Sequence, residues 1–374
     1  MLAAQKESSS YLERTDKYFL SSKTRVFDDI VSWIEEKGFE KIARGLICCE
    51  KKYIELSDEN SHRFLKRCFC GREFCPVCGA SDPRKKRGGF VNKKPKSPVH
   101  RQRYARLWRR LMPFRVLGKV ELTVPKHLRE KFKNIEMLKA LHRRGWAVVR
   151  EVFDAEGAMT NVHFFGDQSD EFHPHVNVLF PTTERRISKR KLKCLQCLWK
   201  LQLYDLCGEF PDVVVVHYSF RDSIIKKAHT LRYVTRPTVG FERFAFGLDE
   251  EMRLFLLSLR RFHNFRWFGI LSNSTHKSYN GEKFEMLSDE EIERNLDHDQ
   301  IVVDKLEKRG CPVCGEKLKY MARRDGEIVK EEIKRREWLP VAADEESWYC
   351  DFDTWLILKN LTKEWGRNDY KRSE

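Results

Sequence analysis

Apolar and polar residues alternate over residues 172–180, and this stretch, FHPHVNVLF, constrains the fold more than any other feature of the sequence. On an extended strand, alternate side chains share one face of the sheet. The apolar set that would face a core is Phe172, Val176, Val178 and Phe180. The opposite face would carry His173, His175, Asn177 and Leu179. A strand with one apolar face needs a second layer to bury it, so the pattern predicts a sheet with helices packed against it.

The segments on either side of this strand carry further strand and helix patterns. Strands are expected at residues 115–124, 146–154, 159–166, 211–220 and 265–273. Helices are expected at 187–208, at 222–234 and at 125–145, the last opened by Pro125 and closed by Gly145. This order favours the α+β class, with a central antiparallel sheet flanked by helices.

A stretch rich in Lys, Arg, Gly and Pro, residues 81–103, disfavours a packed core. It marks either a domain boundary or a loop that contacts DNA. We therefore expect an N-terminal helical and zinc-binding module over residues 1–100, with helix over 25–67. Residues 101–280 would form the α+β domain, and residues 281–374 a C-terminal module that opens with an acidic helix.

Imidazole and amide groups lie two residues apart on the strand expected at 172–180, which suits a divalent cation. His175 and Asn177 are the favoured ligands, and His173 with His175 is the alternative register. The Asn177 amide oxygen favours Mg²⁺ or Mn²⁺ over Zn²⁺, because hard cations prefer oxygen ligands. His163 and Glu151 are candidates for a third ligand. A strand can also present such polar groups to solvent without binding metal.

Tyr233 lies near the end of the helix expected at 222–234, and Lys226, His229 and Tyr233 occupy one face of it. A tyrosine hydroxyl is a weak nucleophile at its ordinary pKa, so it needs a base or a cation nearby. His229 would take its proton or bind metal, and Lys226 would stabilise charge on a phosphate. Packing is the ordinary role of a single tyrosine, so this prediction rests on the combination.

Three segments together resemble a known family. VELTVP at 120–125, HPHVNVLF at 173–180 and LRYVTRP at 231–237 are similar to the motifs of the HUH endonuclease superfamily. RWFGILSN at 266–273 is also similar to the stretch that follows the tyrosine in such proteins. The histidine motif precedes the tyrosine motif, as in rolling-circle replication initiator (Rep) proteins of archaeal and bacterial plasmids and viruses. In conjugative relaxases that order is reversed.

The resemblance covers about 116–275 and implies an HUH endonuclease domain that acts on single-stranded DNA at a replication origin. Tyr233 would nick one strand and hold its 5′ phosphate covalently, which leaves a 3′ hydroxyl to prime synthesis. Two positions depart from the family pattern. Asn177 stands where the family has a second histidine, and Pro237 stands where two-tyrosine relatives have their second tyrosine.

Two other functions stay open at this point. A single-strand transposase of the HUH class would use the same strand-transfer chemistry on element ends. A zinc-containing protein that binds DNA or RNA without cleaving it would keep the fold and lose the reaction, as Asn177 suggests. Host replication proteins are possible partners of an initiator.

Cysteine spacing indicates structural zinc. In CFCGREFCPVCG the CPVCG turn aims the Cys75 and Cys78 sulfurs at one ion, and we favour Cys49 and Cys70 as the other ligands. A second CPVCG motif holds Cys311 and Cys314 but lacks an obvious partner pair. Cys350 with a histidine or aspartate is one possibility, and a site without metal is another. Three further cysteines on the helix expected at 187–208 favour core-facing or incidental roles: Cys194, Cys197 and Cys207.

Positive charge points to a polyanionic partner, since 72 Lys and Arg against 56 Asp and Glu give a formal charge of +16. The predicted phosphate contacts are Arg84, Lys85, Lys86, Arg87 and Arg236. The first four equally suit a solvated linker. No run of 18 apolar residues occurs and the N-terminus lacks a signal-peptide core, so we expect no membrane partner and a cytoplasmic protein.

Overall fold

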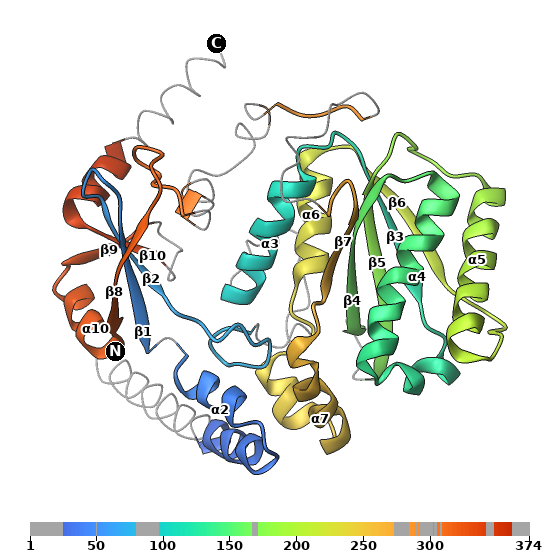
Figure 1. Ribbon diagram of the computed structural model, residues 1–374, viewed down its shortest axis with the longest axis horizontal. Helices are drawn as coiled ribbons and strands as arrows, with labels where there is room; N and C mark the ends of the chain where they lie inside the picture. The colour runs from blue at the N-terminus through green and yellow to red at the C-terminus, as the bar shows by residue number, and fades with distance from the viewer. Residues whose placement is uncertain are drawn as a thin grey trace, which may run out of the picture.

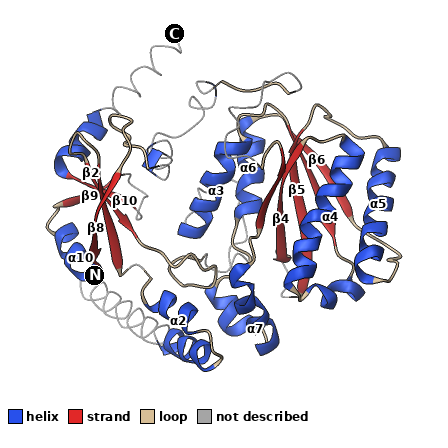
Figure 2. Cartoon of the chain, viewed as in Figure 1, coloured by secondary structure: helices blue, strands red, loops and turns tan. Residues whose placement is uncertain are grey.

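The computed structural model describes residues 25–49, 51–79, 97–166, 171–272, 284–288, 309–341 and 348–360, and residues 291, 302, 305 and 306. Within these ranges the chain forms two separate five-stranded antiparallel sheets with helices packed on them (Figures 1 and 2). The α+β class predicted from the sequence is therefore confirmed. No described helix combines the length and the apolar character that a bilayer crossing needs.

The first sheet has the strand order β6-β3-β5-β4-β7. Its strands are β3 Leu117–Thr123, β4 Gly157–Phe165, β5 Phe172–Pro181, β6 Val216–Arg221 and β7 Phe265–Gly269. The central strand β5 carries the alternating pattern, and its Val176, Val178 and Phe180 are fully buried in the larger hydrophobic core. The expected strand at 211–220 is shorter at its start, where Val213 is 70% exposed.

Two helices cover each face of this sheet (Figure 1). On the core face lie α4 Ile135–Phe153 and α5 Lys189–Cys207, and on the other face lie α3 Pro98–Leu111 and α6 Ile224–Thr235. The second face has its own apolar cluster, which includes Met159 and Leu179 from the sheet and Leu231 and Val234 from α6. The polar residues of β5 thus lie under α3 and α6.

The expected strand at 146–154 is wrong, because these residues continue helix α4. A 3-10 helix, Lys126–Phe132, ends before Asn134, whose side chain caps α4 by accepting the N–H groups of Glu136 and Met137. Gly145 does not end the helix. It lies in its middle, where a Cβ would come within 3.0 Å of Val176, so glycine allows close approach of helix and sheet.

The helix expected over 25–67 is also wrong in its second half. Residues 25–36 and α2 Glu40–Ile47 are helical, but β1 Lys52–Ser57 and β2 Arg63–Arg67 form an antiparallel hairpin. The hairpin turns at Asp58, whose Oδ1 accepts the N–H groups of Asn60 and His62, both at 2.9 Å. This aspartate-centred turn competes with helix formation.

The second sheet joins segments from both ends of the chain in the order β8-β1-β2-β10-β9. Its C-terminal strands are β8 Lys319–Asp325, β9 Trp338–Pro340 and β10 Trp348–Asp351, and α10 Gly326–Lys334 follows β8. β1 pairs with β8 and β2 pairs with β10. The side chains of Leu56, Phe64 and Trp348 meet on one side of this sheet.

Packing crosses both of the expected boundaries, near residues 100 and 280. The first helices and the cysteine loop after β2 share the large core with the first sheet, through Ile34, Phe74 and Cys78. Residues 52–67 instead share a sheet with residues 319–351. The acidic helix expected at 287–299 lies mostly outside the described residues. The remaining described helices are α7 Glu250–Ser258, a helix at residues 352–360, and two short turns, Arg243–Gly247 and Leu259–Arg261.

Candidate active site and metal centres

Polar side chains from three neighbouring strands gather on the face of the first sheet that α3 and α6 cover. In the strand register, His175 pairs with His163 of β4, and Asn177 lies between Asn161 of β4 and Glu121 of β3. The His163 and His175 rings are 5.2 Å apart between centroids. Three of the four expected metal ligands, His175, Asn177 and His163, therefore lie side by side.

Several polar atoms in this group are buried and have no hydrogen-bond partner among the described residues. They are Nε2 of His175, Nδ1 of His163, Oδ1 of Asn161, and both Oδ1 and Nδ2 of Asn177. Native proteins rarely leave buried polar groups unpaired, because each costs about 1–3 kcal/mol. Unpaired groups of this kind are the ones that an ion or an ordered water satisfies in folded proteins.

The two histidines are held in place by backbone carbonyls. His163 Nε2 lies 3.0 Å from the Val234 carbonyl oxygen, and His175 Nδ1 lies 3.0 Å from the carbonyl of His173. Burial lowers the pKa of His163 well below its usual range, and burial also lowers that of His175. Both imidazoles are therefore neutral at pH 7, which is the form that binds metal.

Tyr233 lies next to this group. Its ring centroid is 5.6 Å from that of His163, and the hydrogen bond from His163 to Val234 ties β4 to the following residue of α6. Two cations lie over the ring, Lys119 Nζ at 4.4 Å and the Arg236 guanidinium carbon at 4.2 Å from its centroid. Positive charge beside a phenol favours its ionised form.

Lys119 and Glu121 were not anticipated from the sequence as site residues. Both lie on β3, and Lys119 Nζ donates to Glu121 Oε2 at 2.9 Å. Burial would raise the pKa of Glu121, but the charge of Lys119 and its hydrogen bond oppose this, and the pKa is lowered. The signal was available, because Lys119, Glu121 and Thr123 alternate with apolar residues in VLGKVELTV.

The other expected catalytic residues lie further out. Lys226 is exposed and pairs with Asp222 at 2.8 Å on α6. His229 is half-buried, one turn before Tyr233, and its pKa is lowered by burial and then by Arg221 and Arg232. Lys119 and Arg236 instead supply the charge at the tyrosine ring.

Three further predicted residues have clear positions. His173 is half-buried beside His175, with ring centroids 5.6 Å apart, and burial lowers its pKa to about 4. Glu151 is exposed on α4, against the opposite face of the sheet, so it is not a ligand. Arg236 is only 7% exposed and lies at the tyrosine rather than on the outer surface.

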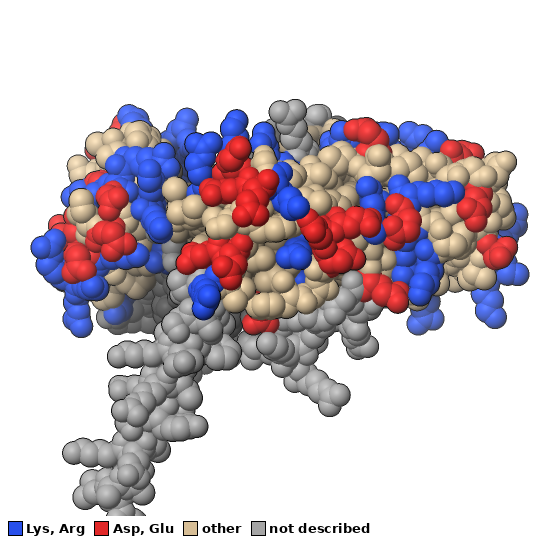
Figure 3. All heavy atoms as spheres, turned by 90° about the horizontal axis from the view of Figure 1, so that it is seen from below, with Lys and Arg blue, Asp and Glu red and all other residues tan. Residues whose placement is uncertain are grey.

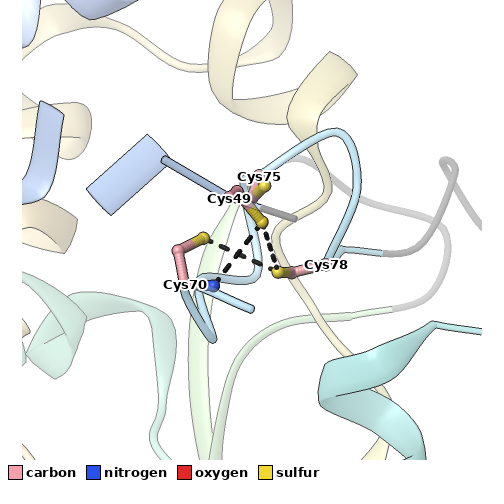
Figure 4. Close-up of side chains that lie close together, drawn as sticks. All are labelled: Cys49, Cys70, Cys75 and Cys78. Atoms are coloured by element: carbon pink, nitrogen blue, oxygen red, sulfur yellow. Dashed lines mark hydrogen bonds between the residues drawn. The ribbon is translucent and has the colours of Figure 1, made fainter. Parts of the chain in front are cut away.

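Cys49, Cys70, Cys75 and Cys78 come together as the sequence predicts (Figure 4). Cys49 follows α2, and the other three lie in the loop after β2. The Cys78 sulfur is 3.3 Å from that of Cys49 and 3.6 Å from that of Cys70. Hydrogen bonds from the thiols of Cys49, Cys70 and Cys78 lower the pKa of Cys75. This group can hold a metal ion such as zinc.

Cys311 and Cys314 acquire partners that the sequence did not indicate. Their ligand atoms gather with those of Asp58 and His62, which lie at the turn of the β1–β2 hairpin. Cys350 is not among them. Its buried thiol points toward the Leu339 carbonyl at 3.8 Å, because β10 pairs with β9. The mixed group can also hold a metal ion.

The predicted basic contacts Arg84, Lys85, Lys86 and Arg87 lie outside the described residues. The face of the molecule in Figure 3 carries acidic and basic side chains side by side, so the excess positive charge is not concentrated there. On α5, Cys194 and Cys197 are exposed and Cys207 is half-buried, so the first two do not face the core. Comparison with protein family models, with curated proteins and with solved structures finds no match.

Proposed function

We propose that this protein is a metal-dependent tyrosine endonuclease that nicks and rejoins single-stranded DNA at a replication origin, as an HUH-type rolling-circle initiator. One observation carries the proposal: Tyr233, His163 and His175 form a continuous row across α6, β4 and β5, with centroid distances of 5.6 Å and 5.2 Å. A tyrosine, two imidazoles and two cationic side chains thus lie together, and this grouping supports the proposal. The resemblance of three sequence motifs adds the reaction class.

In the proposed reaction the Tyr233 oxygen attacks a phosphorus atom of the DNA backbone. The bond from phosphorus to the 3′ oxygen of the upstream segment breaks, and the 5′ phosphate stays on the tyrosine. The phenol proton passes to a base, for which His229 is the nearest expected candidate on α6. The released 3′ oxygen takes a proton from solvent. Attack by a 3′ hydroxyl on the phosphotyrosine reverses these steps and rejoins the strand.

Charged residues of this chain would assist both the Tyr233 hydroxyl and the phosphate that it attacks. Lys119, held by Glu121, lies over the Tyr233 ring and favours its ionised form. Arg236, the second cation over the Tyr233 ring, would contact the scissile phosphate. His175, Asn177 and His163 would hold Mg²⁺ or Mn²⁺, with Glu121 as a further oxygen donor. The bound cation would polarise the phosphate.

A labelling experiment on the full-length protein tests the proposal. The purified chain is incubated with Mn²⁺ and a pool of random-sequence single-stranded oligonucleotides, labelled at either the 3′ or the 5′ end. We expect the 3′ label, and not the 5′ label, to become attached to protein on a denaturing gel. Tyr233→Phe should abolish attachment, and Tyr204→Phe, an exposed tyrosine on α5, should retain it.

Two results would overturn the proposal. If the wild-type protein forms no adduct with any oligonucleotide pool or with single-stranded plasmid DNA, the alternative holds: a zinc-containing protein that binds nucleic acid without cleaving it. If Tyr233→Phe forms the same adduct as wild type, another residue is the nucleophile. A single-strand transposase would give the same adduct, so the two functions are distinguished by the DNA sequence that is cleaved. An initiator would cleave at an origin beside its own gene, whereas a transposase would cleave at the ends of the element that flank its gene.

A further inference from the structure

Asp58, His62, Cys311 and Cys314 form a compact group of four potential ligands that the proposed reaction does not use. Asp58 and His62 come from the hairpin turn between β1 and β2. Cys311 and Cys314 come from a second turn, closed by the hydrogen bond from the Gly315 N–H to the Cys311 carbonyl at 2.9 Å. More than 240 residues separate the two turns in the sequence, since His62 and Cys311 are 249 positions apart.

The spacing of the donor atoms matches a single tetrahedral ion. His62 Nδ1 lies 3.6 Å from the Cys311 sulfur and 3.7 Å from the Cys314 sulfur, and Asp58 Oδ2 lies 3.1 Å from the latter. With zinc bonds of about 2.3 Å to sulfur and about 2.0 Å to nitrogen or oxygen, tetrahedron edges are about 3.3–3.8 Å. The two distances from Asp58 Oδ2 are shorter, 3.1 Å to the Cys314 sulfur and 2.7 Å to His62 Nδ1.

The carboxylate of Asp58 is oriented for this role. Its Oδ1 accepts the backbone N–H groups of Asn60 and His62 in the turn, and this leaves Oδ2 directed at His62 and Cys314. The Asp58 and Cys311 side chains are buried, whereas Cys314 is exposed. Two thiols, one imidazole and one carboxylate on rigid turns are a donor set that zinc accepts.

We propose that these four residues are a second zinc centre, and that the ion joins the two terminal segments of the chain into one sheet. The ion would link the β1–β2 turn directly to the segment that enters β8. Beside it, Leu56, Phe64 and Leu318 form part of a small apolar cluster. Small cores are marginally stable by themselves, and a metal that closes a very long loop stabilises them most.

The two zinc centres should differ in how easily they lose metal. The first has four cysteine sulfurs, of which those of Cys49, Cys75 and Cys78 are buried. The second has two sulfurs, one on the exposed Cys314, with a carboxylate as a weaker ligand. A graded chelator titration of the full-length protein should therefore remove one zinc first, from the mixed centre.

Metal analysis of the full-length protein tests the proposal. Wild type should carry two zinc ions per chain, and Cys314→Ser and His62→Phe should each carry one. Cys194→Ser replaces another exposed cysteine, on α5, and should keep two. Cys75→Ser should also lose one ion, from the other centre, which assigns the two separately. A wild-type content of one zinc, or two ions in both Cys314→Ser and His62→Phe, would overturn the proposal.

Hydrogen exchange locates the effect and does not depend on catalysis. In Cys314→Ser the amides of β8, Lys319–Asp325, and of β1 should exchange at least tenfold faster, while those of β3 and β5 should keep their wild-type rates. If β8 exchanges at the wild-type rate after the zinc is lost, the ion does not join the segments. Failure of the nuclease proposal leaves both readouts unchanged, so the two proposals fail independently.

Discussion

The carboxylate of Glu73, in the loop that carries the four-cysteine group, accepts the backbone N–H of Thr238 at 2.8 Å. The same Oε2 atom accepts the N–H of Val239 at 3.1 Å. The other oxygen, Oε1, accepts a hydrogen bond from the guanidinium of Arg103 on α3. Thr238 lies five residues after Tyr233, just beyond the end of α6. The cysteine loop thus holds the segment that fixes the end of the tyrosine helix.

Glu73→Ala should slow nicking about tenfold without removing zinc. The N–H groups of Thr238 and Val239 and the Arg103 guanidinium lose their acceptor, which costs about 2 kcal/mol of stability. The end of α6 then shifts, and the Tyr233 hydroxyl is held less well in line with the phosphate, which lowers the rate. The rate of adduct formation, measured beside zinc content, checks this. Glu151→Ala, at an exposed glutamate on α4, is the control and should have no effect. Unchanged cleavage by Glu73→Ala would mean that the loop is structural only.

Lys119→Met should reduce the nicking rate by a factor of about 10²–10³, because the charge over the Tyr233 ring is removed with little change in volume. The same change should move the ascending limb of the pH–rate profile to higher pH, because that limb reports ionisation of the nucleophile and a nearby cation favours the ionised form. Lys119→Arg should keep most of the rate. A profile that does not move would show that Lys119 only supports Glu121.

Asn177→Leu should stabilise the metal-free protein and abolish metal-dependent nicking. The amide of Asn177 is buried, and neither of its polar atoms has a partner within the described part of the chain, so an apolar side chain of similar size removes a penalty of about 1–3 kcal/mol. Urea unfolding in the presence of EDTA measures the first effect, and adduct formation in Mn²⁺ the second. Asn177→His, which places a third imidazole beside His163 and His175, should bind Mn²⁺ more tightly than wild type. A destabilised Asn177→Leu variant would indicate an ordinary structural asparagine.

The candidate site could be predicted where periodicity alone decides the position of a residue. Alternation on 172–180 placed His175 and Asn177 on one face, and the spacing in CPVCG with Cys49 and Cys70 gave the complete four-cysteine group. The helix at 146–154 was not predicted, because Gly145 was interpreted as a helix end. Gly145 packs closely against Val176 of the sheet, and this tertiary contact explains why a glycine stands inside the helix.

Pairing between distant segments was not available from the sequence. Nothing local indicates that Asp58 and His62 meet Cys311 and Cys314, since the contact depends on β1 pairing with β8. Cys350 with a histidine or aspartate was one possibility from the sequence, and the group contains a histidine and an aspartate but not Cys350. Lys119 and Glu121 alternate with apolar residues in β3, so the same periodicity places both of them on one face of that strand.

Acid should destabilise the protein through its buried histidines, and His142 is the clearest case. It is 1% exposed, its Nδ1 lies 2.7 Å from Thr160 Oγ1, and burial lowers its pKa to about 3. Between pH 6.5 and 3 the unfolded chain binds a proton that the folded chain refuses. The free energy of unfolding therefore falls by about 1.4 kcal/mol per pH unit for this residue as pH falls.

His142→Gln should remove that part of the pH dependence. The glutamine amide can still bond to Thr160, and it does not titrate. Urea unfolding at pH 6, 5 and 4 measures the slope, which should be shallower than wild type by about 1.4 kcal/mol per pH unit. His127→Gln changes an exposed histidine and should leave the slope as it is. Equal slopes in wild type and His142→Gln would place the titrating group elsewhere.

Helix α3 should provide phosphate contacts next to the tyrosine. It carries five arginines, at positions 101, 103, 106, 109 and 110, and it lies beside α6 on the face with Tyr233 (Figure 1). Arg106 is exposed, whereas Arg103 is held by Glu73 and Arg110 lies over the Trp267 ring at 4.4 Å. Arg106 is therefore the member best placed to meet a DNA strand that approaches the site.

Arg106→Gln should weaken binding of single-stranded DNA similarly for all sequences, because a phosphate contact carries no sequence information. The slope of log affinity against log salt concentration should fall by about 0.7, the value for one phosphate on a single strand. Fluorescence anisotropy with a labelled oligonucleotide at four salt concentrations measures both. Lys193→Gln removes an exposed charge from α5, on the opposite side of the sheet, and should change neither. An equal loss in both variants would mean that net charge alone attracts DNA, and that α3 gives it no defined path to Tyr233.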